Sequence, residues 1–323
     1  MKIFITGGTG FIGTSFIKKL AQTEHELHCL ARETSNTEHL KNAGAKILIG
    51  DITDREILLQ GMDGCDWVVH MASSFEFWVP DNKVFARVNI TGTRYVMESA
   101  LAKKISKVVY VSTAGIFGNT GWPVTEESAP GDERASKYVA TKYEGDLIAW
   151  DLYREKNLPL VVIYPSAVLG AGDPKAAGRY VRNMALGRMP AQVLTDAYFS
   201  FVYVQDVANA IVKALEKENN IGEKYIISAE NLTWGEINRM IAGISGIKSP
   251  MIKLPNGMTM FTAHILTGIA NLIKKPPLWD MSVDQIKLMS QGFKLDGQKA
   301  EKELGIKYTP VEKALEEAIQ SPA

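Results

Sequence analysis

A glycine-rich turn near the N-terminus is the feature that most constrains the fold of this chain. Residues 6–13 read Thr-Gly-Gly-Thr-Gly-Phe-Ile-Gly and follow a short apolar run at residues 3–5. Gly8, Gly10 and Gly13 have the spacing G-x-G-x-x-G. Between a strand and a helix, such a turn lets a pyrophosphate reach the free backbone N–H groups of the helix N-terminus. The turn therefore predicts a dinucleotide-binding unit, with a glycine-rich turn that holds no ligand as the alternative.

The next feature is a regular alternation of short apolar runs with helical patterns. Runs that are apolar along their whole length are typical of strands buried on both faces. The alternation predicts an α/β fold, a Rossmann-type doubly wound parallel sheet with helices on both faces. The expected strands are residues 2–6, 26–31, 45–49, 67–70, 108–112, 160–164 and 225–228, and the clearest helices are residues 11–21, 84–103 and 136–156.

The pattern changes after residue 164. A Gly/Pro-rich loop follows, residues 201–215 suggest a short strand leading into a helix, and the region after residue 230 is mainly helical with several prolines. We therefore predict an NAD(P)-binding Rossmann domain made of residues 1–165 plus 201–228. A smaller, mainly helical substrate-binding domain would comprise residues 166–200 plus 229–323.

Composition narrows the function classes. Lys and Arg (36) balance Asp and Glu (36), so no basic excess suggests a nucleic-acid partner. Cys29 and Cys65 lie in apolar, strand-like stretches, which favours free thiols in a reducing compartment over a disulfide. The first apolar run is too short for a signal-peptide core. We expect a cytoplasmic protein with no metal site.

The most apolar later segment is Met258–Ile273. It is shorter than the ~20 residues that span a bilayer, so no stable membrane insertion is expected. A lid or core helix is the favoured interpretation, and a helix that lies on a membrane surface is a minor alternative.

The end of the second strand bears on the choice of cofactor. Proteins that bind NAD tend to place an acidic residue there for the ribose, whereas NADP favours an arginine for the 2′-phosphate. Here Ala31 is followed by Arg32, which favours NADP(H). NAD(H) stays possible, because Glu33 could bind the ribose and Arg32 could be a solvated loop charge.

Tyr138 and Lys142 stand four residues apart on a predicted helix. A nearby ammonium stabilises a phenolate, which suits a tyrosine to proton transfer. Ser112 and Thr113 follow a predicted strand, where a hydroxyl could bind a substrate carbonyl. Tyr143 has no lysine at the same spacing. Each pair alone could be an ordinary surface or strand-end feature.

Eight short motifs follow one another along the chain. They are T-G-x-x-G-x-x-G at 6–13, D-I at 51–52, H-M-A at 70–72, N-x-x-G-T at 89–93, S-T at 112–113, Y-x-x-x-K at 138–142, P-S-x-V-x-G at 165–170 and F-V-x-V-x-D-V-A at 201–208. In this order they resemble the extended short-chain dehydrogenase/reductases, also called the NAD(P)-dependent epimerase/dehydratase family, and its dihydroflavonol-4-reductase-like branch.

The resemblance implies a role for each residue of the site. Tyr138 would be the general acid/base, and Lys142 would hold the nicotinamide ribose and lower the pKa of Tyr138. Thr113 stands where the family usually has Ser and would orient the substrate oxygen, with Ser112 as the alternative. Relatives are often dimers, so a homodimer is possible. The implied cofactor contacts are Gly7, Thr9, Gly10, Phe11, Ile12, Gly13, Arg32, Asp51, Ile52, Met71, Ala72, Ser73, Asn89, Tyr138, Lys142, Pro165 and Val168.

Two features favour a carbonyl reductase over a nucleotide-sugar epimerase or dehydratase. One is Arg32 without an Asp before it. The other is residues 196–202, where nucleotide-sugar enzymes typically present an arginine to the diphosphate and this chain has none. The expected substrate contacts are Phe75, Phe77 and Trp78. Other apolar candidates, for which core packing is the alternative, are Met258, Met260, Phe261, Trp279 and Met281.

These observations predict an NADP(H)-dependent oxidoreductase that reduces an aldehyde or ketone of a hydrophobic small molecule. An NAD-dependent nucleotide-sugar epimerase or dehydratase is the main alternative. A regulator that senses NADP(H) without turnover is a minor one, because such sensors often lack the Tyr/Lys pair.

Overall fold

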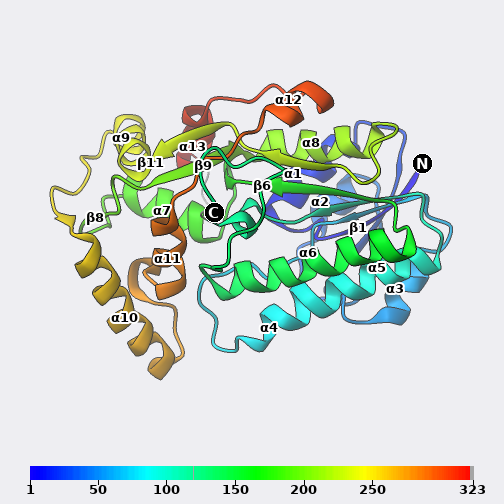
Figure 1. Cartoon of the computed structure of the whole chain (residues 1–323), viewed down its shortest axis with the longest axis horizontal. Coiled ribbons are helices and arrows are strands. Elements are labelled where there is room, and N and C mark those ends of the chain that lie inside the picture. Colours follow the sequence, from blue (N-terminus) through cyan, green and yellow to red (C-terminus); the bar gives the residue numbers. More distant parts are fainter. Residues whose placement is uncertain (119, 321–323) are drawn as a thin grey trace.

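The computed structural model describes residues 1–118 and 120–320, and its centre is a seven-stranded parallel sheet (Figure 1). The strand order is β10-β6-β5-β4-β1-β2-β3, which confirms the doubly wound arrangement. The strands are β1 (Lys2–Thr6), β2 (Glu26–Ala31), β3 (Lys46–Ile49), β4 (Trp67–His70), β5 (Lys107–Val111), β6 (Leu160–Pro165) and β10 (Lys224–Ile227).

The inner strands of this sheet are buried on both faces, as their apolar runs predicted, whereas the edge strand β3 is partly exposed. In β4, Val68 packs into one core and its neighbour Val69 into the other, because successive side chains point to opposite faces. Figure 1 shows α8 above the sheet and α5 and α6 below it. The helices of this part are α1 (Phe11–Leu20), α2 (Glu38–Asn42), α3 (Arg55–Gly61), α5 (Thr93–Ala102), α6 (Lys137–Lys156) and α8 (Val204–Glu216).

The helix predicted over residues 84–103 is not regular. It consists of α4 (Lys83–Phe85), a π-helical segment (Ala86–Gly92) and α5. The wider π turn holds Asn89, whose side chain bonds to the backbone of Ser74 and to the hydroxyl of Thr141. Hydrophobic periodicity could not reveal this turn, because these contacts join three separate segments.

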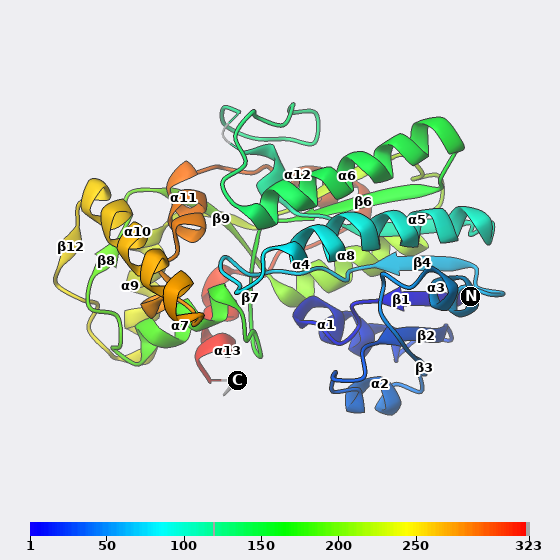
Figure 2. The same ribbon diagram turned by 90° about the horizontal axis from the view of Figure 1, so that it is seen from below.

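The C-terminal region is mainly helical and lies at one end of the sheet, on the left in Figure 1 and Figure 2. It contains two small sheets. One has the strand order β11 (Glu230–Thr233), β9 (Tyr198–Tyr203), β7 (Ala167–Leu169), and the other pairs β8 (Gln192–Val193) with β12 (Lys253–Leu254). Its helices are α7 (Ala176–Ala185), α9 (Trp234–Ser245), α10 (Asn256–Ile273), α11 (Val283–Gln291) and α13 (Val311–Gln320). The proposed domain division also assigns α12 (Gln298–Leu304) to this region, although α12 packs against β10 and α8.

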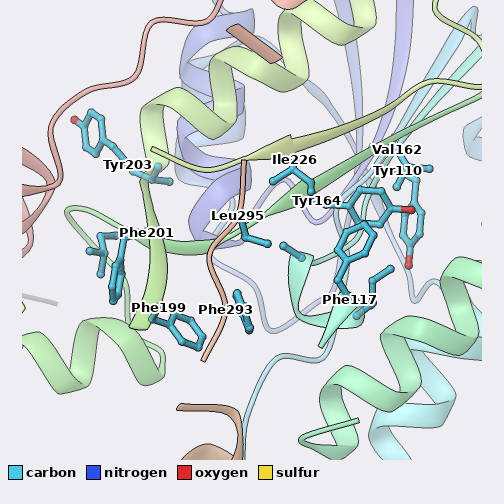
Figure 3. Close-up of a cluster of buried hydrophobic side chains, with 14 of the residues drawn as sticks. Tyr110, Phe117, Val162, Tyr164, Phe199, Phe201, Tyr203, Ile226, Phe293 and Leu295 are labelled. Atoms are coloured by element: carbon cyan, nitrogen blue, oxygen red, sulfur yellow. The ribbon is translucent and has the colours of Figure 1, made fainter. Parts of the chain in front are cut away.

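One apolar cluster joins the sheet to the C-terminal region (Figure 3). On the sheet side, Phe117 packs edge-on against Tyr164, with ring centroids 5.3 Å apart. On the other side, Phe199 of β9 packs against Phe293 at 4.7 Å. This shared core fixes the C-terminal region beside the carboxyl ends of the strands, where ligands bind in such folds.

Candidate functional site

The glycine turn leaves no room for side chains at two positions. Gly7 has a φ of +79°, and a Cβ there would lie 2.5 Å from the backbone N of Ala72. A Cβ on Gly13 would lie 2.1 Å from the carbonyl oxygen of Gly7. No side chain caps the N-terminus of α1, which follows Gly10. The N–H groups of this helix end are therefore available to a phosphate.

Two adjoining cavities lie at the carboxyl ends of the strands. The larger, of about 660 Å³, extends from the glycine turn past Arg32 and Asp51, and the smaller, of about 300 Å³, contains Tyr138. Both have Gly7, Gly10 and Phe11 in their walls. The structure brings nearly all expected cofactor contacts to these walls: Gly7, Thr9, Gly10, Phe11, Ile12, Gly13, Arg32, Asp51, Ile52, Met71, Ala72, Ser73, Tyr138, Lys142, Pro165 and Val168.

Asn89 is the exception, since it lines neither cavity. It is buried, and its side-chain oxygen accepts a hydrogen bond of 2.8 Å from the backbone N of Ser74. Its amide donates to the Ser74 carbonyl at 3.2 Å and to the Thr141 hydroxyl at 3.0 Å. Asn89 thus fastens the segment after β4 to the helix that carries Tyr138.

Tyr138 lies in the wall of the smaller cavity and is almost fully buried. Burial raises the pKa of Tyr138 to about 12, and the hydroxyls of Thr113 and Ser73 beside it oppose this rise. Thr113 also accepts a hydrogen bond from the backbone N of Gly115 at 3.2 Å, which fixes its side chain. At neutral pH the phenol therefore keeps its proton and can donate it.

Lys142 does not meet the expectation that it lowers the pKa of Tyr138 in this structure. Its ammonium donates hydrogen bonds to the Tyr110 hydroxyl and to the Val111 carbonyl, both at 2.9 Å. Burial lowers the pKa of Lys142 to about 7, and the charge of Asp146 opposes this shift. The ammonium is therefore bound by the hydroxyl of Tyr110, a residue that the sequence did not single out.

Ser112 belongs to the same buried layer. Its hydroxyl lies beside Tyr110 and Asp146. Burial raises the pKa of Asp146 to about 6, and the hydrogen bond that the Tyr164 hydroxyl donates to its carboxylate at 3.0 Å opposes the rise. Of Ser112 and Thr113, only Thr113 has its hydroxyl beside Tyr138, so the geometry favours Thr113 for contact with a substrate.

His70 is a fully buried, neutral member of the layer. Its Nδ1 lies 2.7 Å from the Thr6 hydroxyl, its Nε2 lies 3.1 Å from the Thr93 hydroxyl, and its ring stacks on Tyr110 with centroids 5.4 Å apart. Burial, followed by the charge of Lys142, lowers the pKa of His70 to about 3.

This burial of His70 predicts a pH-dependent stability. In the unfolded chain His70 takes up a proton below its ordinary pKa of about 6.5, whereas in the folded chain it stays neutral down to about pH 3. The contribution of His70 to the free energy of unfolding therefore decreases as the pH falls through this window. The difference in free energy of unfolding between wild type and His70→Asn should decrease by about 2 kcal/mol from pH 7 to pH 5. Urea unfolding of both proteins at the two pH values measures it. A constant difference would contradict the neutral, buried state.

The expected substrate contacts are only partly brought together. Phe75 packs edge-on against Tyr138 at 4.8 Å and against Phe77 at 5.4 Å, and both phenylalanines line the smaller cavity. Trp78 lies outside the cavity wall, and its indole N–H donates to the Asn271 side chain in α10 at 2.9 Å.

The C-terminal apolar candidates named from sequence do not line the cavity either. The structure leaves Met258, Met260, Phe261, Trp279 and Met281 out of its wall. The aromatic pattern could not tell which helix face turns towards the site. The C-terminal half of the chain instead contributes Tyr180, Phe199, Trp234, Gln285, Leu288, Met289 and Phe293.

An ion-pair network closes one side of the site. Glu76 accepts hydrogen bonds from Lys175 at 2.7 Å and from Arg179 at 3.2 Å. Arg179 also pairs with Asp280, and its Nε lies 2.9 Å from a carboxylate oxygen. Arg179 is therefore neutralised on two sides. The residues involved are far apart in sequence, so no local signal could reveal the network.

Comparison with known proteins places the chain among NAD(P)-binding enzymes. Residues 3–228 match the family described as "NAD dependent epimerase/dehydratase family". A curated relative, "Putative dihydroflavonol 4-reductase" from Synechocystis sp., is 26% identical over 98% of this chain and 93% of its own length.

Solved structures also resemble this chain. That of gox2253 is 31% identical and superposes with a TM-score of 0.85 over 98% of this chain and 96% of that one. UDP-glucuronic acid 4-epimerase from Bacillus cereus, solved with UDP-glucuronic acid and NAD, has a TM-score of 0.79 at 22% identity, covering 99% of this chain and 98% of that one. The latter likeness concerns the fold alone.

Proposed function

Because this chain belongs to the NAD dependent epimerase/dehydratase family, we propose that it is an NADP(H)-dependent reductase acting on an aldehyde or ketone of a hydrophobic small molecule. Family and relatives establish the coarser statement, an NAD(P)-dependent enzyme that acts on hydroxyl or carbonyl groups. The observation that carries the finer proposal is the Tyr138 and Thr113 hydroxyl pair in an apolar cavity that adjoins the glycine turn.

The residues present fit a dinucleotide. Because Gly7 and Gly13 have no side chains, a pyrophosphate can approach the backbone of the turn. The N-terminus of α1 has no side-chain cap, so its N–H groups can bind the phosphates. Arg32, Asp51 and Ile52 would hold the adenosine end, and Lys142 would face the nicotinamide end. NADPH, when bound, supplies the hydride for the carbonyl carbon.

Tyr138 and Thr113 then act on the carbonyl oxygen. Tyr138 retains its proton at neutral pH, since burial raises its pKa to about 12, and donates it as the oxygen gains charge. Thr113 donates a second hydrogen bond that orients this oxygen. Phe75, packed against the Tyr138 ring, keeps water from one side of the phenol.

The wall of the smaller cavity supports a hydrophobic substrate. Its side chains are mostly apolar, and several are aromatic or methionine, which adapt to irregular ligands. Among the described residues, no arginine lines this cavity, and Lys175 is paired with Glu76. A diphosphate would need a bidentate partner that this wall does not offer.

Cofactor preference gives a testable prediction. Arg32, Asp51 and Arg87 all border the larger cavity, whereas Glu33 is outside its wall. Arg32→Ala should raise the Kd for NADPH by about tenfold or more, since a charged hydrogen bond contributes roughly 1.5–3 kcal/mol. The Kd for NADH should change little. Fluorescence titration with both cofactors measures the change.

Glu33→Gln is the matched control for Arg32→Ala. It alters the neighbouring charged residue outside the cavity and should leave the ratio of NADPH to NADH affinity unchanged. An equal loss of affinity for NADPH and NADH in Arg32→Ala would contradict the assignment of Arg32 to the 2′-phosphate. A switch of cofactor preference in Glu33→Gln would contradict it as well.

The function itself is tested on the purified wild-type protein. An absorbance scan reveals retained NAD(H), and NADPH consumption is then measured with a panel of aldehydes and ketones. We expect exchangeable binding that prefers NADPH, together with turnover of apolar carbonyls. Stoichiometric NAD that survives purification would instead favour a nucleotide-sugar epimerase or dehydratase. Tight NADPH binding without any turnover would favour the sensing regulator.

Two further proposals concern assembly and location. We infer a homodimer through α5 and α6, an arrangement that rests on the family resemblance. The cytoplasm stays the expected compartment, and its support is that both cysteines are buried and unpaired. Burial raises the pKa of Cys29 to about 12 and that of Cys65 to about 11, so both stay protonated thiols.

A further inference from the structure

Helix α10 turns most of its large apolar side chains away from the protein, and only Met260 and Leu266 among them pack against the core. Thr259, Ala263 and Ala270 form its buried side. Its solvent side carries Phe261, which is 68% exposed, and Leu272, which is 83% exposed. This is the reverse of an ordinary surface helix, whose apolar stripe faces the core. The remaining large exposed apolar residues of α10 are Met258, Ile265, Ile269 and Ile273.

The exposed apolar surface continues past both ends of α10. Before the helix, Met251 is 98% exposed and Ile252 is also exposed. After it, Leu278 and Trp279 are exposed. We call this surface, residues 251–252 together with the exposed residues of α10 and residues 278–279, the α10 face. Several large apolar side chains exposed on and beside one helix mark an interaction site on a folded protein.

The charged residues of the chain segment that contains α10 have one sign, and Asp280 at its end is paired with Arg179. Between Glu236 and Asp280 the chain has five Lys and Arg residues and no Asp or Glu, although the whole chain is neutral. Lys253 lies just before α10, and Lys274 and Lys275 follow directly after it, all three exposed. Apolar side chains flanked by cations are complementary to the surface of an anionic bilayer, where the apolar groups enter below the headgroups.

We propose that the α10 face docks this protein on an anionic lipid bilayer. The helix would lie in the plane of the interface, with Phe261 and Leu272 inserted and Lys274 and Lys275 at the phosphates. Among the described helices, none is long and apolar enough to cross a bilayer, so the association is peripheral. A second copy of the chain is a poorer occupant, because it would bring the same cations onto the same face.

Helix α10 is hydrogen-bonded to two segments that contribute to the wall of the smaller cavity. The Thr267 hydroxyl of α10 accepts a hydrogen bond from the backbone N of Val283, where α11 begins, and α11 supplies Leu288 and Met289 to the cavity wall. The side chain of Asn271 in α10 accepts a hydrogen bond from the indole N–H of Trp78, which follows the cavity-lining residue Phe77. Docking would therefore bring the apolar cavity close to the lipid phase.

Vesicle flotation of the full-length protein tests the docking. Wild type should float with phosphatidylglycerol vesicles and stay at the bottom with phosphatidylcholine vesicles. Roughly 1 M NaCl, where the Debye length is about 3 Å, should weaken flotation. The double variant Phe261→Glu/Leu272→Glu should bind at least about tenfold more weakly, because its two anions face the anionic lipid. The affinity of Lys274→Glu/Lys275→Glu for phosphatidylglycerol vesicles should be at least about 25-fold lower, since each lysine contributes roughly fivefold to the affinity.

Ile49→Glu/Ile221→Glu is the matched control. It adds the same two charges at exposed apolar positions outside the α10 face and should float like wild type. Circular dichroism melts establish that all variants fold, and the readout does not depend on enzyme activity.

Three outcomes would overturn the proposal. One is wild-type protein that stays at the bottom with phosphatidylglycerol vesicles. Another is flotation that both α10-face variants retain. The third is a wild-type dimer, seen by sedimentation velocity without vesicles, that Phe261→Glu/Leu272→Glu converts to a monomer, because a second copy would then occupy the face.

Discussion

Tyr138→Phe is expected to lower kcat/KM for carbonyl reduction by about 10²–10⁴-fold, the contribution typical of a positioned general acid. The ring would still fill its place against Phe75, so the cavity should keep its shape. Only the hydroxyl beside Thr113 and Ser73 is removed. The Kd for NADPH should therefore stay within about twofold, which fluorescence titration measures beside the steady-state kinetics.

Tyr143→Phe is the matched control for this experiment. Tyr143 lies five residues further along α6, outside both cavities, with the Arg134 guanidinium 3.8 Å from its ring centroid. Loss of its hydroxyl should leave turnover close to wild type. Full turnover in Tyr138→Phe, or an equal loss in Tyr143→Phe, would show that the proton comes from another group.

Gly13→Ala should have the second-largest effect, on cofactor binding and on stability together. A Cβ there would lie 2.1 Å from the Gly7 carbonyl oxygen and 2.8 Å from the Gly8 Cα. Both atoms belong to the backbone that would hold the pyrophosphate, so the turn must shift. We expect the Kd for NADPH to rise by about 100-fold. The free energy of unfolding should fall by roughly 1–3 kcal/mol. Titration and urea unfolding measure the two effects.

Gly243→Ala offers a close comparison, since both glycines are helical. Gly243 lies in α9, and nothing stands within 4 Å of the position of its Cβ. Alanine should stabilise that helix by about 0.5–1 kcal/mol and leave NADPH affinity unchanged. A Gly13→Ala protein that binds NADPH like wild type would mean that the turn does not approach the cofactor closely.

Local sequence was sufficient for the elements that carry the site. The strands β1, β2 and β4 were predicted with the bounds that the structure shows, because each is an apolar run closed by turn residues. Four-residue spacing placed Tyr138 and Lys142 on one helix, and a glycine spacing placed the turn before α1. These signals depend on neighbours in the chain, so they can be interpreted without knowing the rest of the fold.

What the sequence by itself determined is therefore the α/β alternation, the glycine turn and the residues that meet at the carboxyl ends of the strands. Only the tertiary structure decided that Lys142 binds Tyr110, that Trp234 and Met289 line the cavity, and that α10 exposes Phe261. The physical reason is that periodicity shows which residues share a face of a helix, but not what covers that face. Covering segments come from distant parts of the chain, and the same apolar stripe can face a core, a cavity or an external partner.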